Sequence, residues 1–404
     1  MKRRTSTAVV AVLALVAALV TAVSAGARSQ GDVTIFVAAP VATPIENYPD
    51  APAGAEAAAA AINKAGGLNG SQIKISFCNT QSNPNVAQAC ARQAVSEKAI
   101  AYIGYPGTQS PLQIPILKAA GIPIIGFRSS GNPVDWTDPT VFTPVGGPAS
   151  AYQALPFAFK TLGKKRLFIS YQDVPSAANN AKNALRAAKI AGIPIAGTMV
   201  LPGATTDFAP FVQKLREANP DAVMFINSPG VSGGMMRAAE SLGVKPLWGH
   251  NSGSIGEPEA AQIGDPSKNM LIASDYPSFR DSTQYPGIRK FLAEMQAAGK
   301  DGDPVNLKVT GISTWLTMKL IQQLAKGIKG EVTNANLMAA LKGAAKPINV
   351  EGLVNWAPGA KGPAAIPRWS SIGVYFLTFR NGQAVSWGKE LPQLDLVKAL
   401  KYVR

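Results

Sequence analysis

One short motif in this chain has the residue pattern of a serine nucleophile. Segment 230–234 (GVSGG) matches G-x-S-x-G and lies between an apolar run and a helical pattern, as in the strand-to-helix turn of a hydrolase. A hydrolase also needs a base and an acid. The single histidine, His250, and Glu240 are the only pair available to Ser232, and they follow it too closely for strands to separate the three residues. The sequence therefore favours a helix N-terminus facing an anionic ligand group, with an exported serine hydrolase using Ser232 as an alternative.

The acidic residues do not form the pattern of a metal site. Loops 264–266 and 301–304 have the composition of turns, and the second lacks the ladder of ligands ending in Glu that a calcium loop needs. With one histidine in the chain, most His-based metal sites are excluded. Neither a P-loop nor a dinucleotide-binding G-x-G-x-x-G is present in the sequence. We therefore predict no metal, no cofactor and no catalytic residue.

Hydroxyl and amide side chains instead follow several apolar, strand-like runs. The loops that carry them are 105–110, 128–131, 227–229 and 249–252. In open α/β sheets, ligands bind beyond the carboxyl ends of the strands. Ser, Thr and Asn also cap helices, so each residue has an ordinary structural explanation as well. As a set, these loops predict a site that holds a polar molecule without transforming it.

The elements that must position these loops alternate between strand and helix. Apolar runs rich in β-branched residues are separated by helical patterns in two successive series. Strands are expected at 33–38, 73–77, 100–104, 122–127, 166–171, 195–201, 222–227, 246–248 and 270–274, followed by helices at 286–298 and 305–328 and a hairpin at 373–387. Repeated strand–helix–strand units imply parallel sheets covered on both faces. The sequence therefore predicts an α/β protein with two doubly wound, Rossmann-like lobes.

The first segment has the features of a secretory signal peptide. Lys2, Arg3 and Arg4 precede an apolar run at 8–20, and small residues suitable for cleavage follow near Ala25 and Ala27. The run is shorter than the roughly 18–20 residues that a membrane span needs, which makes a membrane anchor the weaker interpretation. No cysteine lies near the cleavage site, so no lipid anchor is expected. We predict a signal peptide at 1–27 and a periplasmic or secreted mature protein.

The net charge of +15 raises the question of an anionic partner. The Lys and Arg residues are scattered, the densest cluster is 164–166, and aromatic residues are not interleaved with them. A nucleic-acid groove would gather basic and aromatic residues on one surface. We therefore expect a solvated basic surface and no nucleic-acid partner.

The two cysteines of the chain, Cys78 and Cys90, are candidates for a disulfide. Cys78 ends a strand pattern and Cys90 lies in the following helix pattern. An even number of cysteines in an exported chain favours a bridge. The alternative is a pair of free thiols packed as small apolar side chains.

Several short motifs resemble the leucine/isoleucine/valine-binding proteins. The opening of that family, G-A-E followed by I-N and a glycine-rich turn, is matched here at 54–56, 62–63 and 66–70. Later matches, in the order and at the spacing found in the family, are at 103–104, 121–123, 207–208, 220–223 and 239–243. The resemblance covers essentially the whole mature chain.

This resemblance implies a type I periplasmic binding fold, in which two lobes are joined by three crossovers. Lobe 1 would comprise 30–146 plus 276–352, and lobe 2 would comprise 147–275 plus 353–404. The implied function is that of an extracytoplasmic solute-binding protein of an ABC importer. The ligand closes the lobes, and the closed, monomeric form delivers it to the permease. A ligand-sensing receptor module on the same fold is the alternative.

The resemblance also assigns candidate ligand-binding residues. In the family, donors after the third and fourth strands hold the ligand carboxylate, and an aromatic residue precedes the first helix. The positions assigned here are Tyr48, Tyr105, Thr108, Gln109, Ser110, Ser129, Ser130, Asp173, Ser176, Ser228 and Asn251.

Two of these positions depart from the family pattern. Asp173 to Ser176 replace a loop that usually carries a tyrosine, and Asn251 lies where an acid usually binds the ligand ammonium. Only Asp173 could partly substitute for that acid. The departures leave amides, urea-like molecules and aromatic acids open as ligands beside α-amino acids.

Overall fold

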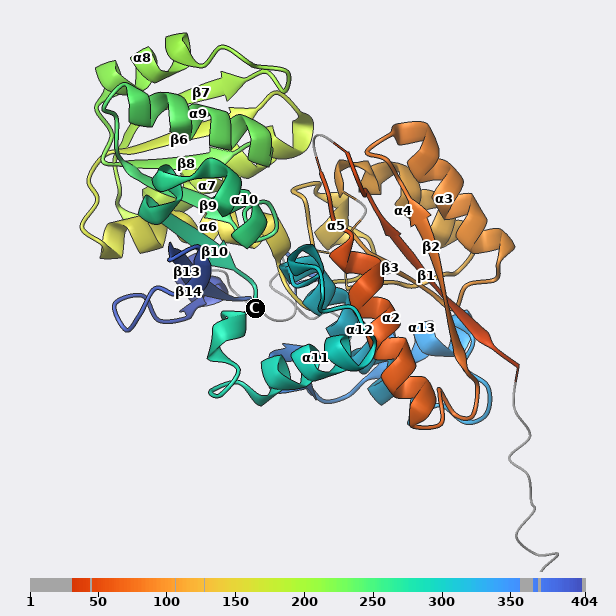
Figure 1. Ribbon diagram of the computed structural model, residues 1–404. Helices are drawn as coiled ribbons and strands as arrows, with labels where there is room; N and C mark the ends of the chain where they lie inside the picture. The colour runs from red at the N-terminus through yellow and green to blue at the C-terminus, as the bar shows by residue number, and fades with distance from the viewer. Residues whose placement is uncertain are drawn as a thin grey trace, which may run out of the picture.

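The computed structural model describes residues 31–43, 46–105, 107–126, 128–356, 366–369 and 372–401. The predicted signal peptide at 1–27 lies outside these ranges. The described residues form two α/β lobes beside one another (Figure 1). We call the body that contains the first sheet lobe 1 and the body that contains the second sheet lobe 2.

Lobe 1 is built on a five-stranded sheet in which every pair is parallel. In spatial order its strands are β2 (Ile73–Asn79), β1 (Val33–Ala39), β3 (Ala101–Gly104), β4 (Ile124–Ile125) and β5 (Val141–Phe142). The accompanying helices are α2 (Asp50–Lys64), α3 (Pro84–Ser96), α4 (Ser110–Ala119), α5 (Val134–Thr137), α11 (Pro286–Ala297), α12 (Val309–Ala325) and α13 (Asn334–Gly343), with short helical turns η2 (Gly107–Gln109), η4 (Phe279–Asp281) and η5 (Pro304–Asn306), and a small hairpin of β11 (Ile348–Val350) and β12 (Val354–Trp356).

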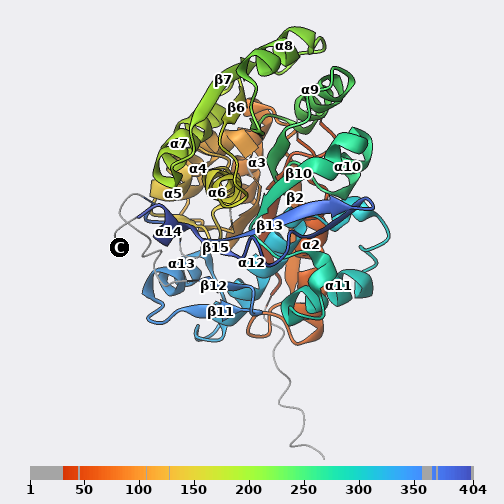
Figure 2. The ribbon, with the colours of Figure 1, turned by 90° about the vertical axis from the view of Figure 1, so that its left-hand side faces the viewer.

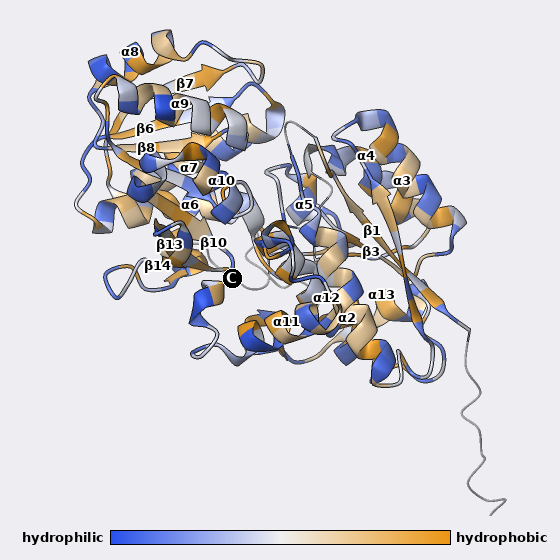
Figure 3. Ribbon diagram, in the orientation of Figure 1, coloured by the Kyte–Doolittle hydropathy of each residue, from blue (hydrophilic) through white to orange (hydrophobic). Residues whose placement is uncertain are grey.

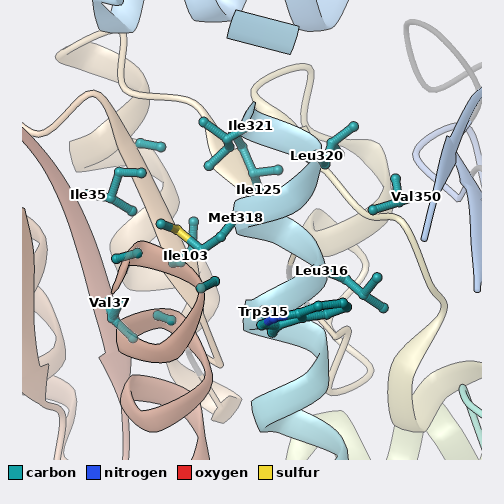
Figure 4. Packing of buried hydrophobic residues seen from close by; sticks show 14 of the residues in the cluster. Ile35, Val37, Ile103, Ile125, Trp315, Leu316, Met318, Leu320, Ile321 and Val350 are labelled. Carbon is teal, nitrogen blue, oxygen red and sulfur yellow. The ribbon is translucent and has the colours of Figure 1, made fainter. Parts of the chain in front are cut away.

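The core of lobe 1 forms where α2 and α12 pack together against the sheet. A Cβ atom at Gly54 of α2 would lie 2.0 Å from the carbonyl oxygen of Gly311 in α12, so the two helices meet with almost no side chain between them. In the same core, Met318 of α12 lies beside Ile103 of β3, and Trp315 extends to the other side of α12 beside Leu316 (Figure 4). This packing brings a helix from late in the sequence onto the first sheet.

Lobe 2 contains an eight-stranded mixed sheet. Its main path runs through β14 (Gln383–Ser386), β13 (Gly373–Arg380), β10 (Met270–Ser274), β9 (Leu247–Asn251), β8 (Ala222–Ile226), β6 (Leu167–Gln172) and β7 (Ile195–Leu201), and β15 (Leu394–Asp395) pairs with β13. The helices are α6 (Gly147–Thr161), α7 (Pro175–Ala191), α8 (Ala209–Ala218), α9 (Pro229–Ser241), α10 (Glu257–Ile263) and α14 (Leu396–Ala399), with the turn η3 (Asp265–Asn269).

The sheet of lobe 2 departs from the predicted parallel arrangement at one edge. Strands β6 to β10 pair in parallel, whereas β13 pairs antiparallel with β10, β14 and β15. The predicted C-terminal hairpin is confirmed, with Arg380 opposite Gln383 around the Asn381-Gly382 turn. It returns beside β10 (Figure 2) and extends the sheet with antiparallel strands.

The chain passes between the lobes more than once. The main core of lobe 1 draws on residues from Val33 to Val145 and from Tyr276 to Trp356. The core of lobe 2 draws on Ala149 to Ala273 and Ile366 to Leu400, with Trp136 of lobe 1 packed against Trp369. The boundaries given above from the family resemblance stay a prediction at the level of single residues.

The predicted disulfide between Cys78 of β2 and Cys90 of α3 is confirmed, with their Cα atoms 5.7 Å apart. It ties an edge strand of lobe 1 to the helix that follows. Colouring by hydropathy shows apolar residues concentrated in the strands of both lobes (Figure 3). In the described part of the chain, no helix combines the length and the apolar character that a bilayer crossing requires.

Candidate ligand-binding cleft

A cavity of about 250 Å³ lies between the lobes, where the carboxyl ends of strands from both sheets face one another. Lobe 1 contributes the loops that follow β1, β2, β3 and β4. Lobe 2 contributes the loops that follow β6, β8 and β9, together with parts of α6 and α7. Parallel strands end at the same edge of a sheet, so each lobe presents its strand-end loops to the other.

Seven of the candidate residues from the sequence line this cavity. They are Tyr48, Tyr105, Gln109 and Ser130 from lobe 1, and Ser176, Ser228 and Asn251 from lobe 2. The structure therefore brings together residues from six different loops or helix starts. Their contact with a ligand stays a prediction.

Ser110 and Ser129 do not line the cavity but lie fully buried beneath it. Ser129 Oγ donates to Asp135 Oδ2 over 2.9 Å, and Ser110 Oγ accepts from Asn132 Nδ2 over 2.9 Å. Burial raises the pKa of Asp135 to about 6, opposed by these hydroxyl hydrogen bonds. In this structure the two serines hold the loop after β4 in place.

Asp173 is exposed and is not among the residues that line the cavity. The side chain of Thr108 lies outside the part of the protein that the structure describes. The proposed ligand contacts of these two residues stay predictions.

Asn251 lines the cavity, but its polar atoms are already bonded within lobe 2. Its Oδ1 accepts from the backbone N–H groups of Gly253 and Ser254, at 2.9 and 3.1 Å. Its Nδ2 donates to the Tyr152 hydroxyl oxygen at 2.6 Å. Asn251 therefore shapes the loop after β9. It carries an amide in place of a carboxylate, and its amide oxygen is already used, so it is not placed to bind a ligand ammonium.

Several lining residues were missed by the sequence prediction. They are Glu46, Ser82, Tyr152, Gln172, Asn180 and Ser254, whereas Asn227 belongs to the predicted loop 227–229. Glu46 and Ser82 follow β1 and β2, so the strand-end rule could have found them had it been applied to every strand. Tyr152 and Asn180 lie inside helices, and no local signal separates them from other buried helix residues.

Among the described residues that line the cavity, Glu46 is the only one with a charged side chain. Ser82 Oγ donates to Glu46 Oε2 over 3.2 Å. The surrounding protein removes enough water from this carboxyl group to raise its pKa to about 7, and the Ser82 hydrogen bond lowers it only partly. The neighbouring rings of Tyr48 and Tyr105 pack edge to face, 4.6 Å apart, and burial holds the pKa values of both phenols well above their usual value.

The two lobes touch across the cleft. Asn180 Nδ2 of α7 donates to the backbone oxygen of Ser130 in the loop after β4, over 2.8 Å. Both residues are buried. This hydrogen bond joins one residue from each lobe at the edge of the cavity, so it can form only when the lobes are close together.

Ser232 and His250 form a buried pair that is arranged unlike a catalytic one. Ser232 Oγ and His250 Nε2 are 3.1 Å apart, and both side chains are fully buried. The backbone N–H of Asn251 donates to His250 Nδ1 over 2.9 Å. Because Nδ1 accepts, the neutral ring carries its proton on Nε2, which then donates to Ser232. Burial lowers the pKa of His250 to about 3, and Glu240 pairs with Lys245 instead.

A second cavity, of about 240 Å³, lies between β10, β13, α11 and the start of α12. Its walls are mostly apolar, including Ile272, Phe279 and Leu377, and they also include Ser252 from the loop after β9 and the segment that follows β10. Among the described residues, no group of three or more His, Cys, Asp or Glu side chains could hold a metal ion.

Comparison with known proteins agrees with this architecture. The periplasmic binding protein family model matches residues 33–364. A Leu/Ile/Val-binding protein homologue from Brucella abortus (strain 2308) is 25% identical over 273 residues, which cover 65% of this chain and 68% of the relative.

Solved structures share the fold. A branched-chain amino acid ABC transporter protein from Thermus thermophilus with bound valine aligns with a TM-score of 0.74 and 19% identity, over 92% of this chain and 98% of that one. A solute-binding protein of an ABC transporter from R. palustris in complex with 4-hydroxybenzoate gives 0.73 and 18%, over 90% and 97%. The resemblance drawn from the sequence motifs is confirmed, and the chain belongs to the periplasmic binding protein family.

Proposed function

We propose that this protein captures a small polar solute between its lobes and delivers it to the permease of an ABC importer. The observation that carries the proposal is the cavity lined from both lobes by hydroxyl, phenol and amide groups. A ligand that contacts both lobes stabilises their closed arrangement relative to the open one. The permease would then recognise the closed form.

The setting of this function follows from the predicted N-terminal signal peptide. Cleavage after Ala27 would release a mature chain that begins at Arg28. We propose a free, monomeric protein outside the cytoplasmic membrane. The ligands in the related structures, valine and 4-hydroxybenzoate, make α-amino acids and aromatic acids the first classes to test.

A thermal-shift screen of the mature protein tests solute binding directly. Amino acids, amines, amides, ureas, aromatic acids and sugars should each be added in large excess. A ligand that binds only the folded protein raises the unfolding temperature as its concentration rises above its dissociation constant. We expect a concentration-dependent shift with one chemical class, and no shift with any class would contradict the proposal.

We also propose that the protein catalyses no hydrolysis through Ser232. The hydroxyl is fully buried, and the neutral His250 ring donates to it rather than accepting from it. We expect the wild-type protein to leave 4-nitrophenyl acetate uncleaved above the buffer rate, and Ser232→Ala to keep the ligand affinity of the wild type. Ester cleavage that disappears in Ser232→Ala would instead support the hydrolase alternative.

A further inference from the structure

We propose that the solute carries a protonated amine or a similar cationic donor group, held in lobe 1 by the carboxylate of Glu46. This inference rests on the proposed function and names the chemical class of its ligand. The family pattern described above places the acid for the ligand ammonium in lobe 2. Here the acid comes from the opposite lobe, so the amine of the solute would face lobe 1.

Glu46 is placed for this role by the loop between β1 and α2. Its Oε2 atom accepts from Ser82, and the carboxylate packs so closely on η2 that a Cβ at Gly107 would lie 2.7 Å from Oε2. The phenols of Tyr48 and Tyr105 stand beside it in the cavity wall. The carboxylate is thus fixed in position while part of it remains open to the cavity.

The charge that lines the cavity in the described residues is negative and favours a cation. Glu46 carries the single charged side chain of the lining that the structure describes. Two basic side chains lie near the cavity without lining it. Arg128 is paired through Nε with Asp275 at 2.8 Å, while its buried Nη1 has no hydrogen-bond partner among the described residues, and Lys308 is paired with Glu259 at 2.9 Å. A carboxylate without an amine would therefore meet only neutral donors, and it would be repelled by Glu46.

Lobe 2 adds a second acceptor that needs a donor. Asn180 lines the cavity and is 3% exposed, and its Nδ2 is used in the contact with Ser130. Its Oδ1 is buried, and no donor in the described part of the chain reaches it. Buried polar atoms are normally hydrogen-bonded. A solute rich in N–H groups would supply donors to an acceptor in each lobe.

Binding of an amine requires the ionised form of Glu46, which makes the affinity pH-dependent. The groups that face Glu46 are the hydroxyl of Ser82 and the phenols of Tyr48 and Tyr105, which are neutral near pH 7 because burial holds their pKa values high. The pKa of Glu46 itself is raised by burial to about 7. Below that pH the carboxyl group gains a proton, so the affinity for an amine should fall roughly tenfold per pH unit.

The test uses matched compounds and matched variants of the full mature protein. Leucine, isoamylamine and 4-methylpentanoate share one carbon skeleton and differ only in amine and carboxylate. Diamines, guanidino compounds and further amino acids, each paired with its nitrogen-free analogue, extend the series, and sugars and amides serve as neutral compounds. Affinities are measured by calorimetry at pH 8 and pH 5.5 for the wild type, Glu46→Gln, and Glu331→Gln as an exposed glutamate in the same lobe.

We expect an amine-bearing compound to bind the wild type at pH 8 at least tenfold more tightly than its nitrogen-free analogue. Glu46→Gln should lose tenfold or more of that affinity and its pH dependence, and Glu331→Gln should lose neither. Binding by nitrogen-free acids or sugars alone, or an unchanged affinity in Glu46→Gln, would overturn the inference and leave the solute-binding function standing. Absence of binding by every compound would contradict both.

Discussion

Replacing Arg128 with methionine is expected to lower the free energy of unfolding by about 3–5 kcal/mol. Arg128 follows β4 in lobe 1, and its Nε donates to Asp275 Oδ2 over 2.8 Å at the end of β10. The exposed fractions of the two side chains are 1% and 3%. Removing one partner leaves the other charge buried without compensation, and this penalty is larger than the loss of the hydrogen bond alone.

Asp275 makes this pair a junction between the lobes. Its second oxygen, Oδ1, accepts from the backbone N–H of Gly147, where the chain enters lobe 2. On the other side, a Cβ at Gly253 of lobe 2 would lie 2.5 Å from Arg128 Nη1. The pair therefore fixes a lobe 1 loop, a crossover and a lobe 2 loop at one point.

Chemical denaturation of the wild type and the variant measures this effect. Lys118→Met is the matched control, because Lys118 forms an ion pair with Asp138 in the same lobe but its side chain is 47% exposed. Such an exposed pair should contribute at most about 1 kcal/mol. Adding Asp275→Asn to Arg128→Met should restore part of the lost stability, since the uncompensated charge is gone. A loss in Arg128→Met no larger than that in Lys118→Met would refute the assignment.

Local signals in the sequence mark the ends of several elements. Asn83 accepts from the first N–H groups of α3 with Pro84 at its first position, and Thr333 caps α13. These caps depend on residues only a few positions apart, so the sequence alone determines them. The alternating pattern predicted both α/β lobes for the same reason, because each strand–helix–strand unit is local.

Long-range packing explains where the sequence prediction was wrong. The G-x-S-x-G segment at 230–234 was expected to precede a helical pattern, whereas α9 already begins at Pro229 and includes the whole segment. Phe208 requires a glycine at 234 inside this helix, because its nearest ring atom would lie 2.3 Å from a Cβ there. The glycine is thus a packing residue, and nothing near it in the sequence reveals its partner.

The candidate site shows the same limit. Ser129 and Ser130 are neighbours after β4 and look equivalent in the sequence. Ser130 lines the cavity, whereas Ser129 turns inward to Asp135. Which hydroxyl faces the cavity depends on the fold of the loop, because the hydrogen bond to Asp135 holds the Ser129 hydroxyl away from the cavity. The sequence could therefore locate the strand-end loops but could not separate the residues that line the cleft from those that support it.

Gly131→Ala is expected to weaken ligand binding by roughly a hundredfold, with a smaller effect on folding. Gly131 lies in the loop after β4 and faces α7 across the cleft. A Cβ at this position would lie 2.6 Å from Asn180 Nδ2 and 2.7 Å from the backbone oxygen of Ser176. Forced overpacking of this kind costs about 1–3 kcal/mol, and the upper value corresponds to about a hundredfold in affinity.

The clash distinguishes the closed arrangement of the lobes from the open one. Asn180 and Ser176 belong to lobe 2, so the added methyl group meets them only when the lobes are together. The positive φ of +116° at Gly131 strains an alanine in both arrangements, and that strain affects folding rather than closure.

Gly66→Ala controls for this backbone strain, because Gly66 has a φ of +104° and no atom lies within 4 Å of the added Cβ. Calorimetry with the tightest ligand from the thermal-shift screen measures the affinity, and denaturation without ligand measures the folding cost. A methyl group that destabilises the closed form must lower the affinity for a ligand that binds the closed form. Equal affinities for Gly131→Ala and Gly66→Ala would therefore mean that this contact does not control closure.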